Sequence, residues 1–346
     1  MRCNPSWLGP PSASFSRLLF CAFLMVGCGT EAPPMRIEGE TATLSEVVDP
    51  RIDAFLQGAV AEEHFSGAAL VVKDGAIMHA KGYGLAAPGK PNTVNTVFHV
   101  ASVTKQFTAA AVLQLVEAGM VDLDGSINAY LPQQYWSPVW QGVRVRHLLS
   151  HSSGITDYAV VRDYYDVVDG FCLGDTVNGM IREAMEKPLE FAPGTQYTYS
   201  NIGFTLLGEI IEEQTGMPYA QYMQEKILRP MGMTSSRIHV EGHVPSANEA
   251  AGYRWDEATQ QHVKDDVVSL PVTAPDGGLV TTLGDFMRWI QLYAGGDQEI
   301  LTQASLDAMT SPQISLGRDG EIDSYGFGLS VGERLLGHSG YIVGFR

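Results

Sequence analysis

The sequence is poor in basic residues and in long hydrophobic runs, and each shortage excludes a class of protein. It has 22 lysine and arginine residues against 39 aspartate and glutamate residues, which gives a formal net charge of −17. Proteins that bind nucleic acid need clustered positive charge, and no such cluster is visible, so we expect no nucleic-acid partner. No internal stretch approaches the roughly 18 apolar residues of a membrane-spanning helix, which excludes a protein with several membrane spans.

Cysteine is also scarce, and its placement excludes a disulfide framework. Three of the four cysteines, Cys3, Cys21 and Cys28, lie at the start of the chain, and Cys172 stands alone in the rest. We interpret Cys172 as a buried structural thiol. The remaining composition, 45% hydrophobic and 18% charged over 346 residues, is typical of a folded protein with one large domain or two modest ones.

The N-terminus has the pattern of an export signal. Arg2 and Arg17 are the only charges before Glu31, and an apolar run over residues 18–26 leads into Cys28. The residues before Cys28 resemble a bacterial lipobox, so we predict a signal peptide over 1–27, lipidation of Cys28 and a tether over 28–44. An ordinary signal peptide cut near Cys28 is the alternative. Both place the protein outside the cytoplasm, at the periplasmic face of the envelope or secreted.

The rest of the chain predicts strands, then helices, then strands. The dipeptide Asp74-Gly75 strongly indicates a hairpin turn, and it separates strand-like segments over 67–72 and 76–83. Helices are expected over 44–63, 102–118, 201–216, 218–228 and 282–293, and further strands over 325–331 and 335–343. This order indicates an α/β fold in which helices flank an antiparallel sheet, interrupted by a large, mostly helical insertion.

The first chemistry-bearing motif is Ser102-Val103-Thr104-Lys105. Three residues are nearly one helical turn, so Ser102 and Lys105 share a helix face. A serine hydroxyl becomes a good nucleophile when a base takes its proton, and burial can lower the pKa of a lysine enough for that task. Taken alone the motif is weak, because a serine also favours the N-cap of a helix.

Two further triplets could complete such a site. Tyr199-Ser200-Asn201 precedes an apolar helix, and a tyrosine can move protons while an asparagine can hold a substrate amide. His338-Ser339-Gly340 lies on a late strand, where a glycine permits close approach of a ligand. Each triplet alone is better explained as a helix cap or as a structural histidine.

Taken together, the three motifs resemble the serine β-lactamase-like and penicillin-binding superfamily. This group includes class C β-lactamases, D,D-carboxypeptidases and family VIII esterases, which carry Ser-x-x-Lys, Tyr-x-Asn and Lys/His-Thr/Ser-Gly in this order. Four further segments are similar to sequence motifs of the family: residues 145–155 (VRHLLSHSSGI), 199–208, 228–233 and 277–285. The resemblance covers about residues 46–346.

The resemblance implies a role for each site residue. Ser102 would be acylated, and Lys105 and Tyr199 would share the proton transfers, with the choice of base left open. Asn201 would orient the substrate amide, and His338, Ser339 and Gly340 would hold its carboxylate or acyl group. The backbone N–H groups of Ser102 and Tyr341 would form the oxyanion hole. The domain would span 45–346, with 45–115 and 285–346 as its α/β part and 116–284 as its helical part.

The sequence departs from the family's pattern in two places. His338 stands where efficient β-lactamases usually have lysine, which argues against strong β-lactamase activity. Family members also continue past the third motif with two strands and a terminal helix, whereas this sequence stops at Arg346. We therefore expect a C-terminally truncated chain whose late strands lack neighbours, with poor solubility or weak activity.

These observations predict a secreted serine hydrolase that forms an acyl-enzyme on a peptide, ester or β-lactam carbonyl. The alternative is a penicillin-binding or sensor protein that acylates without turnover, or an inactive fragment. We expect a small-molecule or peptidoglycan-like peptide substrate, a monomer and no cofactor. No metal site is expected: His147 and His151 are four residues apart, but no zinc-binding motif accompanies them. An α/β-hydrolase is disfavoured because the chain lacks a Gly-x-Ser-x-Gly elbow.

Overall fold

A computed structural model of the chain describes residues 21–24, 44–157, 167–168, 171–172, 177–240, 244–256, 258–264, 274–294, 300–342 and 344–345. The predicted signal peptide and tether, Cys28 included, lie outside the described residues except for Cys21–Leu24 and Leu44. Their roles therefore remain predictions. Among the helices of the described part, none is long and apolar enough to cross a membrane.

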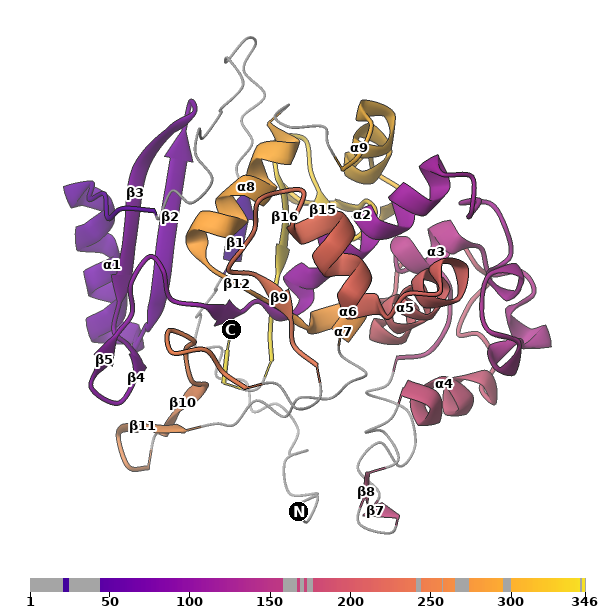
Figure 1. Cartoon of the computed structure of the whole chain (residues 1–346), viewed down its shortest axis with the longest axis horizontal. Helices are drawn as coiled ribbons and strands as arrows, with labels where there is room; N and C mark the ends of the chain where they lie inside the picture. Colours follow the sequence, from indigo (N-terminus) through magenta and orange to yellow (C-terminus); the bar gives the residue numbers. More distant parts are fainter. Residues whose placement is uncertain are drawn as a thin grey trace.

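The N-terminal hairpin forms as predicted. β2 (Gly67–Lys73) and β3 (Ala76–Tyr83) pair antiparallel around Asp74-Gly75, and both turn residues have positive φ, 49° and 78°. α1 (Pro50–Glu63) lies against this hairpin (Figure 1). The helix begins six residues later than predicted because Pro50 suits its first position and the Asp49 carboxylate caps it, accepting from the Arg51 and Ile52 N–H groups.

The centre of the molecule is α2 (Thr104–Glu117), which is buried along most of its length. Its Phe107 ring stacks on Trp289 of α8 (Leu283–Tyr293) with ring centroids 3.8 Å apart, and both side chains are fully buried. Burial of a large side chain of this kind contributes about 2–3 kcal/mol to stability. The helix therefore cannot shift without disturbing the core, and this anchors the residues at its N-terminus.

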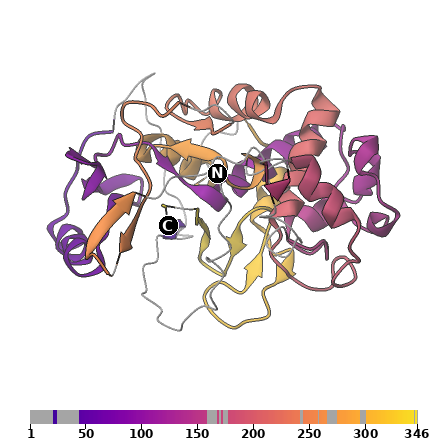
Figure 2. The ribbon, with the colours of Figure 1, turned by 90° about the horizontal axis from the view of Figure 1, so that it is seen from below.

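One side of α2 is covered by the predicted helical part, which Figure 2 shows on the side of the molecule opposite the β2–β3 hairpin. α5 (Asn201–Thr215) and the short α7 (Ala274–Gly277) both pack against α2. The described residues of this part also form α3 (Val145–Leu149), α4 (Val177–Met185) and α6 (Tyr219–Tyr222), which continues as a π-helix over Met223–Leu228. Short 3₁₀ helices lie at Ile127–Ala129, Gln133–Tyr135 and Pro138–Trp140.

A three-stranded antiparallel sheet joins the two parts of the chain. It has the order β6 (Phe98–His99), β12 (Leu279–Thr281) and β9 (Arg237–Ile238). β9 and β12 fall within the segment that the sequence predicted to be mostly helical. Because only a short turn separates β6 from α2, this sheet fixes the direction from which the chain enters the helix.

A five-stranded antiparallel sheet holds the C-terminal strands, next to α8 and α9 (Gln303–Thr310) (Figure 1). Its order is β1 (Cys21–Leu24), β16 (Leu336–Ser339), β15 (Ser330–Val331), β14 (Ser324–Tyr325) and β13 (Ile314–Ser315). The sequence analysis expected these strands to lack neighbours, but in the described structure β16 has a neighbour on each edge. One of them belongs to the predicted signal peptide, so the expectation remains a prediction for a chain without residues 1–27. The backbone of Cys21–Leu24 pairs with one edge of β16 and β15 pairs with the other.

Three small hairpins complete the described structure: β4 (Leu85–Ala87) with β5 (Lys90–Pro91), β7 (Val167–Val168) with β8 (Phe171–Cys172), and β10 (Tyr253–Asp256) with β11 (Gln261–Lys264). The prediction of an α/β fold with antiparallel sheets and flanking helices is confirmed.

Candidate active site

Ser102 lies in a short 3₁₀ turn, Ala101–Val103, between β6 and α2. The turn contains a strained residue, since Ala101 has φ 46°, in the left-handed region that residues other than glycine rarely adopt. Two hydrogen bonds hold this conformation: Thr104 Oγ1 donates to the Ala101 carbonyl at 2.6 Å, and the Val100 N–H donates to the Leu279 carbonyl at 3.1 Å. Strain that is fixed by its surroundings is typical of functional positions.

Lys105 is fully buried, and its ammonium group lies beside Ser102. Nζ is 3.1 Å from Ser102 Oγ, 2.8 Å from Asn201 Oδ1 and 2.8 Å from the Asp276 carbonyl oxygen. An ammonium has three N–H donors, so these three acceptors use all of them. When Lys105 loses a proton and its other two donors are retained, the lone pair faces the Ser102 hydroxyl.

The surroundings lower the pKa of Lys105 from 10.5 to about 8. Burial is the main cause, because it disfavours the charged form, and the carboxylates of Asp276 and Asp157 act in the opposite direction. The nearest Asp276 carboxylate oxygen lies 3.9 Å from Nζ. Lys105 is therefore a base whose neutral form is accessible at only mildly alkaline pH.

This arrangement predicts the effect of Asp276→Asn. The substitution removes a negative charge that stabilises the protonated lysine, so the pKa of Lys105 falls further. If the neutral amine is the active form, the acid limb of the pH profile of kcat/KM should move to lower pH by roughly one unit or more. Steady-state rates over a pH series measure the shift, and an unmoved limb would show that Asp276 does not control this proton.

The second motif reaches the same place from the start of α5. Ser200 caps the helix, its hydroxyl accepting from the Gly203 N–H at 3.3 Å, and its own N–H donates to His151 Nδ1 at 3.1 Å. Asn201 is fixed by Asp157, whose two carboxylate oxygens accept from the Asn201 backbone N–H at 2.7 Å and from Nδ2 at 3.1 Å. The Asn201 side chain therefore presents its oxygen to Lys105.

Tyr199 completes the group around the nucleophile. Lys105 Nζ lies 4.8 Å from the centre of its ring, and the ring of His151 packs on it with centroids 4.2 Å apart. Burial raises the pKa of Tyr199 well above 10, although a hydrogen bond with Ser102 acts in the opposite direction. Tyr199 is therefore a neutral phenol that can donate a proton.

His338 lies across the site, with its ring centroid 6.1 Å from that of Tyr199. Its Nδ1 lies 2.6 Å from the Ser339 carbonyl oxygen and its Nε2 lies 2.9 Å from the Tyr325 hydroxyl. Because a carbonyl can only accept, Nδ1 carries the proton, and in the neutral ring Nε2 accepts from Tyr325. Desolvation, followed by the charge of Lys105, lowers the pKa of His338, which favours this neutral form.

The remaining residues of the third motif form the edge of the site. Ser339 is exposed at the end of β16, and Tyr341 is 65% exposed. A Cβ atom on Gly340 would lie 2.2 Å from the Val100 carbonyl oxygen, so only glycine allows β16 to approach the turn before Ser102. The oxyanion hole predicted from the backbone N–H groups of Ser102 and Tyr341 remains a prediction.

The structure thus brings the three predicted motifs together. The sequence reasoning did not identify Asp157, Asp276 and Tyr325 as site residues, and it considered His151 as a metal ligand, which it rejected. Asp157 lies 44 positions from its partner Asn201, and Asp276 lies 171 positions from Lys105. No local spacing pattern connects residues so far apart, so no signal in the sequence could have found these contacts.

Residues 52–346 match the protein family described as Beta-lactamase. The chain belongs to this family. Among characterised relatives, penicillin-binding protein 4* of Bacillus subtilis is 30% identical over 305 residues, which cover 82% of this chain and 65% of that protein. A D-aminopeptidase of Brucella ovis is 31% identical over 312 residues, covering 86% of this chain and 56% of the enzyme. The chain therefore spans between half and two thirds of these relatives.

A solved structure of the same family agrees with the fold. The octameric penicillin-binding protein homologue from Pyrococcus abyssi matches with a TM-score of 0.73 and 31% identity, covering 84% of this chain and 68% of that one. The resemblance predicted from the three motifs is confirmed. The chain is a member of a family of serine hydrolases with the β-lactamase fold.

Proposed function

We propose that the protein is a hydrolase that forms an acyl-enzyme on Ser102 and cleaves a small amide or peptide next to a D-amino acid. The observation that carries the mechanism is the 3.1 Å contact between Ser102 Oγ and the buried Nζ of Lys105, whose pKa is lowered to about 8. The similarity to a D-aminopeptidase supports the choice of substrate.

In the acylation step, neutral Lys105 takes the proton of Ser102 as Oγ attacks the substrate carbonyl. The negative charge on the carbonyl oxygen is stabilised by the backbone N–H groups of Ser102, in the turn before α2, and of Tyr341, after β16. Tyr199, a neutral phenol beside Ser102, donates a proton to the leaving amine, and the phenol is restored from Lys105. Water then attacks the ester, with a proton passing back to Ser102 as the acid product leaves.

The opposite directions of the two pKa shifts support a division of the proton roles between Lys105 and Tyr199. The pKa of Lys105 is lowered toward neutrality, whereas the pKa of Tyr199 is raised well above 10. A base must be available unprotonated near the working pH, and a neutral phenol is better suited to act as the acid. These directions favour Lys105 over Tyr199 as the acylation base.

The neutral state of the His338 ring supports the proposal that the substrate has no free carboxylate beside the scissile bond. Both ring nitrogens are engaged, Nδ1 by Ser339 and Nε2 by Tyr325, and the ring is neutral. A neutral ring offers no fixed positive charge to the carboxylate that β-lactam drugs carry. We therefore expect amides and esters to be better substrates than β-lactams.

A substrate panel tests this proposal. We expect kcat/KM for D-alanine amide or a D-alanyl p-nitroanilide to exceed the value for the L-enantiomer and for the β-lactam nitrocefin by roughly 100-fold or more. Equal rates for both enantiomers would refute the stereochemical part. A fluorescent penicillin that labels the protein for hours, with no turnover of any amide or ester, would instead establish a penicillin-binding protein that acylates and stalls.

A further inference from the structure

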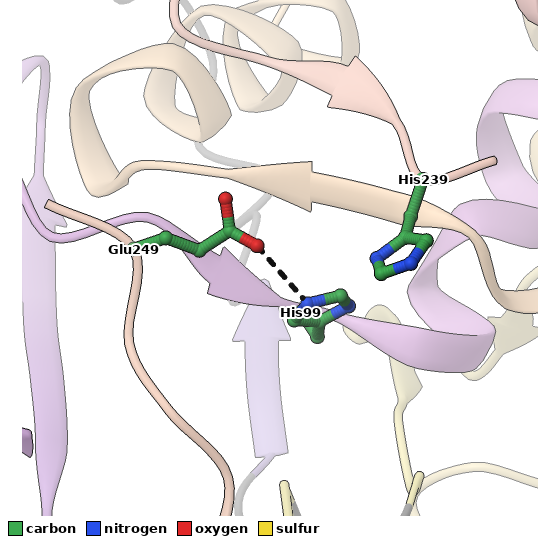
Figure 3. Close-up of side chains that lie close together, drawn as sticks. All are labelled: His99, His239 and Glu249. Atoms are coloured by element: carbon green, nitrogen blue, oxygen red, sulfur yellow. Dashed lines mark ion pairs between the residues drawn. The ribbon is translucent and has the colours of Figure 1, made fainter. Parts of the chain in front are cut away.

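A second cluster of chemistry-bearing side chains lies at the end of β6, outside the group around Lys105. His99, His239 and Glu249 each offer one nitrogen or oxygen atom, and these three atoms all lie within 4.8 Å of one another. Figure 3 shows the three side chains pointing toward one another from three separate segments. His99 Nε2 is 3.3 Å from Glu249 Oε1, and the two histidine rings have centroids 4.9 Å apart.

The strand register explains why these residues meet. His99 of β6 pairs with Val280 of β12, and Val280 pairs with Arg237 of β9. Because residues paired across strands share a face, the side chains of His99, Val280 and Arg237 leave the same face of the sheet. His239 is two residues beyond Arg237 and faces the same way, with its N–H donating to the Gly278 carbonyl at 2.7 Å. The cluster is therefore fixed by backbone pairing.

Glu249 reaches this face from a different segment. It forms a parallel bridge with Val97, which is two residues before His99 and so shares its face. Its side chain is 2% exposed and that of His99 is 5% exposed, while His239 is half-buried. Arg237 pairs with the second carboxylate oxygen, Oε2, which leaves Oε1 directed at His99.

We propose that His99, His239 and Glu249 bind one zinc ion or a chemically similar divalent transition-metal ion. Two imidazoles and one carboxylate are a donor set that zinc accepts, usually in a tetrahedral arrangement with an open fourth position for water. With bonds of about 2.1 Å, ligand atoms in such a site lie roughly 3.4 Å apart. The His99–Glu249 separation already matches this value, and the other pairs need to close by about 1.5 Å or less.

The surroundings suit a metal site. Arg237 orients the carboxylate through the oxygen that does not face the histidines, as hydrogen-bond partners of metal ligands commonly do. The half-buried His239 gives an ion a route from solvent, and the ring of Phe345 lies beside His99 with centroids 5.1 Å apart. Hard cations such as Mg²⁺ prefer oxygen donors, so two imidazoles select against them.

The ion has a structural role at this position. It joins β6 to the end of β9 and to the segment around Glu249, whose ligands lie 140 and 150 residues after His99 in the sequence. His99 is also three residues before Ser102, so the ion would stiffen the strand that carries the strained turn of the nucleophile. The site does not depend on the proposed hydrolase activity, because none of its ligands belongs to the group around Lys105.

Direct metal binding tests the proposal on the full chain. After removal of metal with a chelator, Zn²⁺ affinity is measured by competition with a chromophoric chelator, and Co²⁺ is added to look for the visible bands of a tetrahedral site. We expect one equivalent of Zn²⁺, an increase in the melting temperature with Zn²⁺ but not with Mg²⁺, and a tetrahedral Co²⁺ spectrum. His239→Ala and Glu249→Gln should each lower the Zn²⁺ affinity by roughly 100-fold or more.

His262→Ala is the matched control, because His262 is an exposed histidine on β11 with another histidine ring, that of His64, 6.1 Å away. This variant should bind Zn²⁺ as tightly as the wild type. Circular dichroism establishes that each variant is folded, and His239→Asn replaces His239→Ala if the latter is not. Failure of the wild type to bind at about 100 µM Zn²⁺, or equal affinity in folded His239 variants, would overturn the proposal and leave the three residues as an ion-pair network.

Discussion

Replacing Ser102 by alanine should remove both hydrolysis and covalent labelling. The substitution deletes the oxygen that is to be acylated and leaves Lys105 with Asn201 and Asp276 as its remaining partners. Loss of a nucleophile of this kind lowers kcat by roughly 10⁴-fold or more, because binding and the oxyanion donors alone retain only a small part of the rate enhancement. The measurement is kcat with the best substrate of the panel, together with gel labelling by a fluorophosphonate.

Ser311→Ala provides the comparison for this variant. Ser311 is an exposed serine that ends α9, where its hydroxyl donates to the Asp307 carbonyl at 2.6 Å. Its removal should leave kcat within about twofold of the wild type, since surface substitutions away from special features rarely matter. Labelling of folded Ser102→Ala protein would show that another residue is the nucleophile.

Lys105→Met should have the second largest effect. Methionine fills nearly the same buried space but cannot accept a proton from Ser102, so kcat/KM should fall by roughly 10²- to 10⁴-fold. In the wild type, Lys105 is protonated below its pKa of about 8 and cannot act as a base there. The rate should therefore rise about tenfold per pH unit up to that value and level off above it.

The pH profile of the variant separates a catalytic loss from a merely structural one. With Lys105 gone, the small remaining activity should no longer show the limb near pH 8. If the activity were lost only through misfolding, the molecules that remain folded would keep that limb, and only the amplitude of the profile would fall. Circular dichroism gives the folded fraction independently. An unchanged limb in Lys105→Met would assign it to another group and contradict the proposed base.

Much of the fold was predictable because it is encoded locally. Asp74-Gly75 specifies a tight turn through its backbone conformation, and the two strands around it have nearly the predicted bounds. The apolar helix expected over 102–118 is α2, at Thr104–Glu117, because a helix that is apolar nearly all round can only be buried. Ser102 is not its cap but belongs to the preceding 3₁₀ turn.

The central site was predictable for a different reason. Lys105 and Ser102 are one helical turn apart, so their contact follows from helix geometry, while Tyr199, Asn201 and His338 were assigned from family motifs. The geometry around them could not be predicted. The strained backbone at Ala101 depends on the hydrogen bond from Thr104 and on the bond between Val100 and Leu279 of β12. The neutral state of His338 depends on its contact with Tyr325 and on desolvation.

The cluster of His99, His239 and Glu249 shows most clearly where sequence reasoning ends. Metal motifs are recognised in a sequence by short spacings on one helix or loop, such as the interval between His147 and His151. The three residues here are joined by strand register between distant segments. Register is a tertiary property, so the sequence gives no sign of it.

Peptide mapping of a covalent adduct tests the central claim most directly. The wild-type protein is incubated with a fluorophosphonate or a slowly released acyl substrate, digested, and analysed by mass spectrometry. The account predicts one equivalent of adduct, located on Ser102, that forms faster as the pH rises toward 8. An adduct on any other residue, or no adduct on protein that is folded and turning over substrate, would contradict it.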